Sequence, residues 1–172
     1  MTSKTWTNED GLQVPFGQDQ ARETGAIAGK IAMDGPVAYL VMDVNFDDFP
    51  DYTADLNNDG TLNGFSDSDA YIPAGSYIVS ATLIIETLFA GGTDYDIGIY
   101  EKDGTAISAQ GIDATLVLAD IDGAADVVKC NGALAGGILS VGTDDAYIKF
   151  VEEGTFTAGK MKLVIAYVQV AP

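Results

Sequence analysis

Histidine is absent from this sequence of 172 residues, and cysteine occurs once, as Cys130. A single cysteine cannot form an internal disulfide, and without histidine the usual zinc, copper and haem sites lack their commonest ligand. Histidine is also the side chain that acid–base and nucleophilic catalysis recruit most often. The chain contains neither a Gly-x-Ser-x-Gly elbow nor a glycine-rich phosphate-binding loop. We therefore expect no enzymatic activity and no organic cofactor.

Basic residues are scarce, with 8 Lys and Arg against 26 Asp and Glu, for a net charge of −18. Nucleic-acid binding depends on cations that replace phosphate counterions, and an anionic membrane surface repels an acidic protein. No uncharged apolar run approaches the roughly 18–20 residues that span a bilayer. The segment Met1–Asp10 is polar, unlike a secretory signal peptide. The sequence predicts no nucleic-acid partner, no membrane partner and no secretion by that route.

Hydrophobic residues make up 47% of the chain, which is enough to build a core, and the acid is mostly aspartate. Aspartate disfavours helix interiors, and the 20 glycines often occur in pairs typical of turns, such as Asp59-Gly60 and Asn131-Gly132. These features predict an all-β protein.

Alternating or β-branched segments indicate where the strands lie. We expect strands at Val37–Phe46, Tyr77–Phe89, Tyr95–Glu101, Thr105–Ser108, Ala146–Glu152 and Met161–Val170, and one short helix around Leu118–Val128. Short strands joined by glycine turns favour an antiparallel β-sandwich of the jelly-roll or Greek-key type, with a barrel as the main competitor. The sandwich is expected to occupy residues 37–172 as one domain.

Residues 1–36 are weakly patterned and carry isolated large apolar side chains at Trp6, Leu12, Val14 and Phe16. Such a segment can become ordered on a neighbour's surface, where new contacts offset the entropy lost. We expect a partly extended N-terminal arm whose four apolar residues contact a partner. A second irregular segment, the acidic loop at 47–70, interrupts the sandwich.

The sharpest local motif lies in that loop. Oxygen-bearing side chains occupy positions 1, 3, 5 and 9 of a calcium loop at Asp55, Asn57, Asp59 and Asn63, with Gly60 at position 6 and Thr61 at position 7 to offer its carbonyl. Position 12, however, is Ser66 rather than a bidentate carboxylate. The motif therefore predicts either a structural calcium site or a solvated acidic loop with an Asp-Gly turn.

Carboxylate pairs and aromatics allow two further interpretations. Carboxylate pairs such as Asp94 and Asp96 could act as the acid and base of a glycoside hydrolase. However, such pairs arise by chance in a chain with 26 acidic residues. Trp6 and seven tyrosines could form a sugar-stacking platform, although strand aromatics more often pack in cores. The aromatic residues therefore leave a carbohydrate-binding or adhesion module open as a function.

Several sequence segments, taken in this order along the chain, resemble segments of a known group of proteins: Tyr71–Leu83, Phe89–Thr93, Asp96–Tyr100, Asp126–Val128, Asn131–Leu134 and Gly154–Gly159. Across about Val37 to Val170 the chain resembles capsid knob or decoration proteins of short-tailed marine cyanophages. The resemblance implies a non-enzymatic structural protein on the exterior of a phage capsid, made in the host cytoplasm. Its implied partners are the major capsid protein, other virion proteins or further copies of itself. The alternative function is a carbohydrate-binding or adhesion module on a phage or cell surface.

Overall fold

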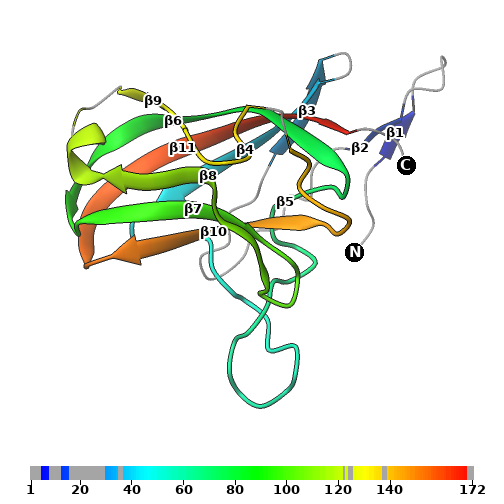
Figure 1. Cartoon of the computed structure of the whole chain (residues 1–172), viewed down its shortest axis with the longest axis horizontal. Helices are drawn as coiled ribbons and strands as arrows, with labels where there is room; N and C mark the ends of the chain where they lie inside the picture. The colour runs from blue at the N-terminus through cyan, green and yellow to red at the C-terminus, as the bar shows by residue number, and fades with distance from the viewer. Residues whose placement is uncertain are drawn as a thin grey trace.

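The computed structural model describes three N-terminal strands as backbone, and residues 37–169 in full apart from 122, 124–125 and 137–138. Within this part of the chain, the strands and one 3-10 turn follow one another as shown in Figure 1: β1 (Thr5–Thr7), β2 (Gln13–Pro15), β3 (Lys30–Asp34), β4 (Val37–Asn45), β5 (Tyr71–Ile72), β6 (Ser76–Gly91), β7 (Asp94–Tyr100), β8 (Ala106–Val117), η1 (Leu118–Asp120), β9 (Val127–Lys129), β10 (Ala146–Glu153) and β11 (Phe156–Gln169). None of these residues belongs to a helix long and apolar enough to cross a membrane.

Two antiparallel sheets face each other and form the body of the protein (Figure 1). The five-stranded sheet has the order β3-β4-β11-β6-β9, and the four-stranded sheet has the order β5-β10-β7-β8. β1 and β2 pair separately, with Trp6 opposite Val14. The predicted antiparallel β-sandwich is therefore confirmed, in preference to the competing barrel.

The eight strands from β4 to β11 pair as nested partners. β7 pairs with β8, β6 with β9, β5 with β10, and β4 with β11, so each pair encloses the one before it. Neighbouring pairs lie in opposite sheets, and the first and last strands of this set meet inside the five-stranded sheet. The winding therefore brings segments far apart in sequence, such as Leu40 and Ile165, into direct register.

The core lies between the sheets because alternate residues of each strand point inward. In β4, Leu40, Met42 and Val44 are buried while Asp43 and Asn45 are exposed, as the period of two predicts. Ile97 and Ile148 are buried from the opposite sheet. Burying each side chain of this size contributes about 1.5–3 kcal/mol to the stability of the folded state. The inward faces of the two sheets therefore supply the main stabilisation of the sandwich.

Three expectations from the sequence need adjustment. The short helix around Leu118–Val128 is wrong: the described residues there form one 3-10 turn at Leu118–Asp120 and the strand β9. The sheet also begins before Val37, because β3 pairs with β4 within the segment assigned to the arm. Finally, β8 extends far beyond Ser108, with register shifts where it passes β7. Gly98 permits this path, since a Cβ there would lie 2.5 Å from the Ala109 carbonyl oxygen.

The long β8 carries Asp113 into the core, where its side chain is only 1% exposed. Its Oδ2 accepts the Asn131 N–H at 3.0 Å. Burial raises the pKa of Asp113 above its ordinary value and outweighs the hydrogen bonds from Asn131 and Cys130, while the charges of Asp120 and Asp96 raise it further. The folded state therefore favours the protonated form of this carboxyl group.

We predict that Asp113→Asn stabilises the protein at pH 7. Because the folded pKa is raised, the stability contributed by protonation is complete below the unfolded pKa of about 3.9 and is lost as pH rises through the folded pKa. The amide keeps an acceptor for Asn131 without a buried charge. Thermal melts should show a higher Tm for the variant at pH 7 and a smaller difference at pH 4. The exposed Asp144→Asn is the control, and a lower Tm for Asp113→Asn at pH 7 would contradict the prediction.

Candidate functional site

The loop between β4 and β5 is the candidate site, and it is folded onto the sandwich rather than solvated along its whole length. Backbone hydrogen bonds join Ala54 to Gly64 in both directions and close the base of the tip. Phe65 N–H donates to the Lys102 carbonyl at 2.8 Å, and Phe150 N–H donates to the Pro50 carbonyl at 2.9 Å. Both halves of the loop are therefore fixed to the four-stranded sheet.

An aromatic cluster under the loop supplies the packing. Phe65, which is 1% exposed, stacks on Tyr147 with ring centroids 5.0 Å apart. Tyr52 meets Phe65 edge-on at 5.2 Å, and Tyr100 completes the group from β7. These residues form a second hydrophobic cluster, separate from the core between the sheets. Tyr100 and Tyr147 point outward from the sheet, so the loop covers what would be an exposed aromatic surface.

Lys149, on β10, contacts both an acidic residue of the loop and the aromatic cluster. Its Nζ lies 3.1 Å from Asp51 Oδ1 and 3.7 Å from the centroid of the Tyr52 ring. Burial lowers the pKa of Lys149, but the hydrogen bond and charge of Asp51, together with Tyr52, outweigh it and raise that pKa overall. Lys149 therefore stays charged at neutral pH and bridges loop and sheet.

The tip of the loop, residues 55–63, contains all five predicted calcium ligands. Asp55 accepts backbone N–H groups from Asp59 and Gly60, and Asn63 Oδ1 accepts that of Leu56 at 2.8 Å. Asp59 Oδ1 accepts the Thr61 N–H, while Asn57 Oδ1 also faces the Asp59 N–H at 3.3 Å. The ligand oxygens thus converge on the tip backbone, and Gly60 takes a positive φ of 89° there.

The carboxylates that follow the tip have other partners. Asp67 forms an ion pair with Lys102, and Asp69 accepts hydrogen bonds from the Thr53 hydroxyl and the Ser66 N–H. The part of the chain that the structure describes brings no three His, Cys, Asp or Glu side chains together as a metal site. Calcium binding at the tip therefore stays a prediction that would rest on Asp55, Asp59 and amide or carbonyl oxygens.

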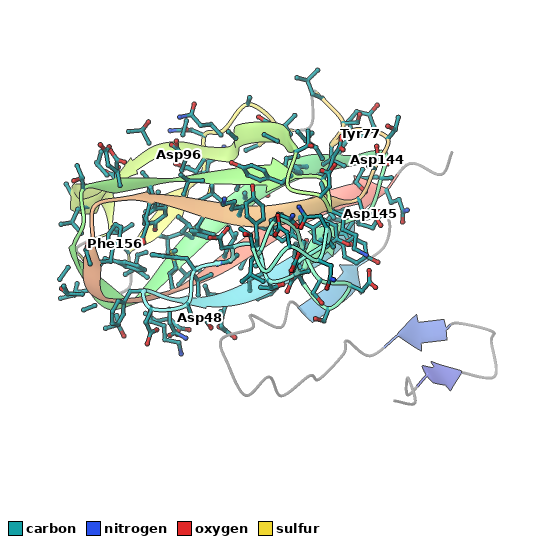
Figure 2. The ribbon with its side chains drawn as sticks, turned by 90° about the horizontal axis from the view of Figure 1, so that it is seen from below. Asp48, Tyr77, Asp96, Asp144, Asp145 and Phe156 are labelled. Carbon is teal, nitrogen blue, oxygen red and sulfur yellow. The ribbon has the colours of Figure 1, made fainter. Side chains whose placement is uncertain are left out.

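The cysteine and the carboxylates considered for catalysis are held by burial or by hydrogen bonds within the fold. Burial, together with the neighbouring Asp113, raises the pKa of Cys130 to about 12, so its thiol is protonated at neutral pH. Asp96 accepts the Thr115 N–H at 2.6 Å and the Gln110 side-chain amide at 2.9 Å. Figure 2 shows Asp96 on one long side of the sandwich and the Asp144 and Asp145 pair at one end.

An open pocket of about 310 Å³ lies at that end of the sandwich, and it was not foreseen from sequence. It is lined by Glu101, Lys102, Asp103, Asp144, Asp145 and Tyr147. Carboxylates in this arrangement can accept hydrogen bonds from hydroxyl groups, but the lining residues include no serine, cysteine or histidine to act as a nucleophile. The sequence signal was weak because the turn at 101–103 and the loop at 144–145 are far apart along the chain.

The tyrosines proposed as a sugar platform are divided by the fold. Tyr95 and Tyr167 are buried in the core between the sheets, and Tyr100 and Tyr147 are buried beneath the loop. Tyr71 is 37% exposed and tilts against Tyr147. Leu12, Phe16 and the side chains of Trp6 and Val14 lie outside the described part of the structure, so the predicted partner contacts stay predictions.

We predict that Phe65→Ala frees the loop. Loss of a buried phenylalanine costs about 3–5 kcal/mol, and because this cluster lies outside the main core, part of that loss should appear as local opening. Limited proteolysis should cut residues 55–63 faster in the variant. Leu62→Ala is the control, since Leu62 is 57% exposed and such changes usually stay within about 0.5 kcal/mol. Equal cleavage rates for both variants would contradict the aromatic anchor.

If the tip binds calcium, the ion should raise the Tm by mass action, by about 2.7 kcal/mol of stability at a hundredfold excess over Kd. Calorimetry with calcium and with a chelator measures the shift. Asp55→Asn keeps an oxygen for the Gly60 N–H but removes one carboxylate charge, so the shift should shrink in that variant. An unchanged Tm in the wild-type protein would remove the calcium site.

No protein-family model matches the sequence, and no curated protein matches it. Among solved structures, the chain is similar to one described as the capsid of Ralstonia phage GP4, at 20% identity. The similarity covers 81% of this chain and 88% of that chain, with a TM-score of 0.49.

Proposed function

We propose that this protein is a non-enzymatic structural component of a phage virion that decorates, or projects from, the exterior of the capsid. The observation that carries the proposal is the nested strand order, β4-β11-β6-β9 against β5-β10-β7-β8. This order supports a jelly roll, the architecture of many viral capsid domains and of lectins. A fold alone does not decide function. The proposal therefore also rests on the resemblance of the segment from Val37 to Val170 to phage decoration proteins.

The charge of the chain is compatible with display on a particle. With a net charge of −18, copies repel one another at low ionic strength, and salt confines this repulsion to a Debye length of roughly 3–10 Å. Hydrated carboxylates keep a densely displayed surface soluble. The N-terminal segment before β3 is the proposed link to the major capsid protein or another virion protein, through Trp6, Leu12, Val14 and Phe16.

Purified particles of a phage that encodes the chain provide the test. Mass spectrometry is expected to find its peptides in a constant ratio to the major capsid protein, and an impermeant amine reagent should label its lysines in intact particles. Deletion of Met1–Gly17 should leave the sandwich folded. When purified protein is added to particles made without this protein, the truncated form should cosediment with them less than the full chain does. Absence from the particle, or labelling only after disruption, would overturn the exterior location.

The alternative is a carbohydrate-binding or adhesion module, which the same architecture also supports because lectins share it. A glycan array separates the two functions. A decoration protein should show no sugar preference while binding assembled capsids. Saturable binding to one glycan class, abolished by substitution of the exposed pocket residues Asp144 and Asp145, would favour adhesion instead.

A further inference from the structure

The two outer faces of the sandwich differ in how they are covered. The loop from β4 to β5 packs on the four-stranded sheet through Phe65 and Tyr52. On the five-stranded sheet, by contrast, the outward residues of β6 and β9 include exposed apolar side chains: Ile84 is 37% exposed and Val127 is 66% exposed. These two residues are direct partners across β6 and β9, so they lie side by side on the same face.

The same face carries three lysines together with the carboxylates of Asp43 and Glu86, so Lys129 is the cation that the described residues leave for a partner. Lys129 lies opposite Thr82, and Lys162 lies opposite Ile84, so both share the outer face with Ile84 and Val127. Lys160 Nζ lies 2.9 Å from Glu86 Oε2, and Lys162 pairs with Asp43 and Glu86. Among the described residues Lys129 forms no ion pair. Val164 is half-buried and lies opposite Thr82, so it belongs to the same face. We call this surface the lysine face; it consists of Ile84, Val127, Val164, Lys129, Lys160 and Lys162.

The loop tip combines exposed apolar side chains with acids, which complements the exposed Ile84 and Val127 and the cation of Lys129. Residues 55–63 include Asp55 and Asp59 and contain no basic residue. Leu56 and Leu62 are 46% and 57% exposed there, so the tip presents apolar side chains among acids. The closed base at Ala54 and Gly64 and the aromatic cluster hold the tip as a fixed projection, which reduces the entropy lost when it binds.

We propose that the lysine face binds the loop tip of a second copy of this chain, head to tail. Leu56 and Leu62 of one copy would pack on Ile84, Val127 and Val164 of the next, with Asp55 and Asp59 near Lys129. Figure 1 shows the tip projecting on the side of the four-stranded sheet, away from the five-stranded sheet. One chain therefore cannot satisfy both surfaces by itself, and each copy keeps one tip and one face for its neighbours.

Such a contact is heterologous and produces a closed ring when the rotation between copies closes, or an open chain when it does not. It is independent of the capsid proposal, because it requires only the surfaces of this protein. Salt should affect it in two ways. It screens the general repulsion between acidic copies and also weakens the local attraction of Asp55 and Asp59 for Lys129, so the apolar residues are needed for association in concentrated salt.

The test uses two variants that damage opposite sides of the contact. Val127→Glu with Lys129→Glu alters the lysine face and leaves the tip intact, whereas Leu62→Lys alters the tip and leaves the lysine face intact. Sedimentation velocity should show concentration-dependent self-association of the wild-type protein. Each variant alone should associate at least about tenfold more weakly, a loss of about 1.4 kcal/mol. An equimolar mixture should form a 1:1 heterodimer that grows no further, because one intact tip meets one intact face.

The controls separate this contact from general surface effects. Val151→Glu changes another exposed apolar residue, 42% exposed on β10, and should leave self-association unchanged, as should the conservative Lys129→Arg. Melting temperatures close to wild type establish that the variants fold. A wild-type protein that stays monomeric, or a mixture that stays monomeric, overturns the proposal. Loss of association in the face variant without restoration in the mixture indicates face-to-face pairing and also overturns it. The particle analysis above is unaffected by either result.

Discussion

The closure of the sandwich depends on the pairing of β4 with β11 in the five-stranded sheet. These strands are the first and last of the nested set, and their register runs from Lys160 opposite Asn45 to Tyr167 opposite Ala38. Because side chains alternate between faces, a slip by one residue would turn Leu163 and Ile165 out of the core. The buried face of this pair therefore specifies the register in which the first and last strands of the nested set meet.

The same winding explains why the acidic loop is rigid at its base. β5 contains only Tyr71 and Ile72 and lies at the edge of its sheet. The chain must travel from the end of β4 to this short strand, and it passes over the outer face of β7 and β10. Tyr100 and Tyr147 on those strands offer an apolar surface, and Phe65 and Tyr52 cover it. A long insertion thus becomes a fixed projection, with exposed acids at its tip.

Charge and packing together divide the surface into unlike regions. Carboxylates dominate the tip and the pocket end, where Asp144 and Asp145 lie close together in Figure 2. Lysines gather on the five-stranded sheet, where Lys160 and Lys162 share Glu86. Hydrogen bonding to Lys160 is the largest influence that lowers the pKa of Glu86, although partial desolvation opposes it. Because charge is unevenly distributed, the net charge alone does not predict which part of this protein binds another surface.

The sequence by itself determined the fold class and most of the strands, because alternation and turn glycines are local signals. Val37–Phe46 and Ala146–Glu152 matched β4 and β10 within a residue. Of the missed elements, β5 and β9 pair with distant strands, whereas β3 pairs with the adjacent β4 but lies in a segment without clear alternation. β9 has three residues, and its hydrogen bonds to β6 override the alanine-rich context that suggested a helix. Only the tertiary structure decided that Phe65 is buried while Leu62 is exposed, that Asp67 and Asp69 bind Lys102 and Thr53, and that lysines distant in sequence share one face. Each of these depends on which strands become neighbours, and the free energy of that choice comes from the whole core.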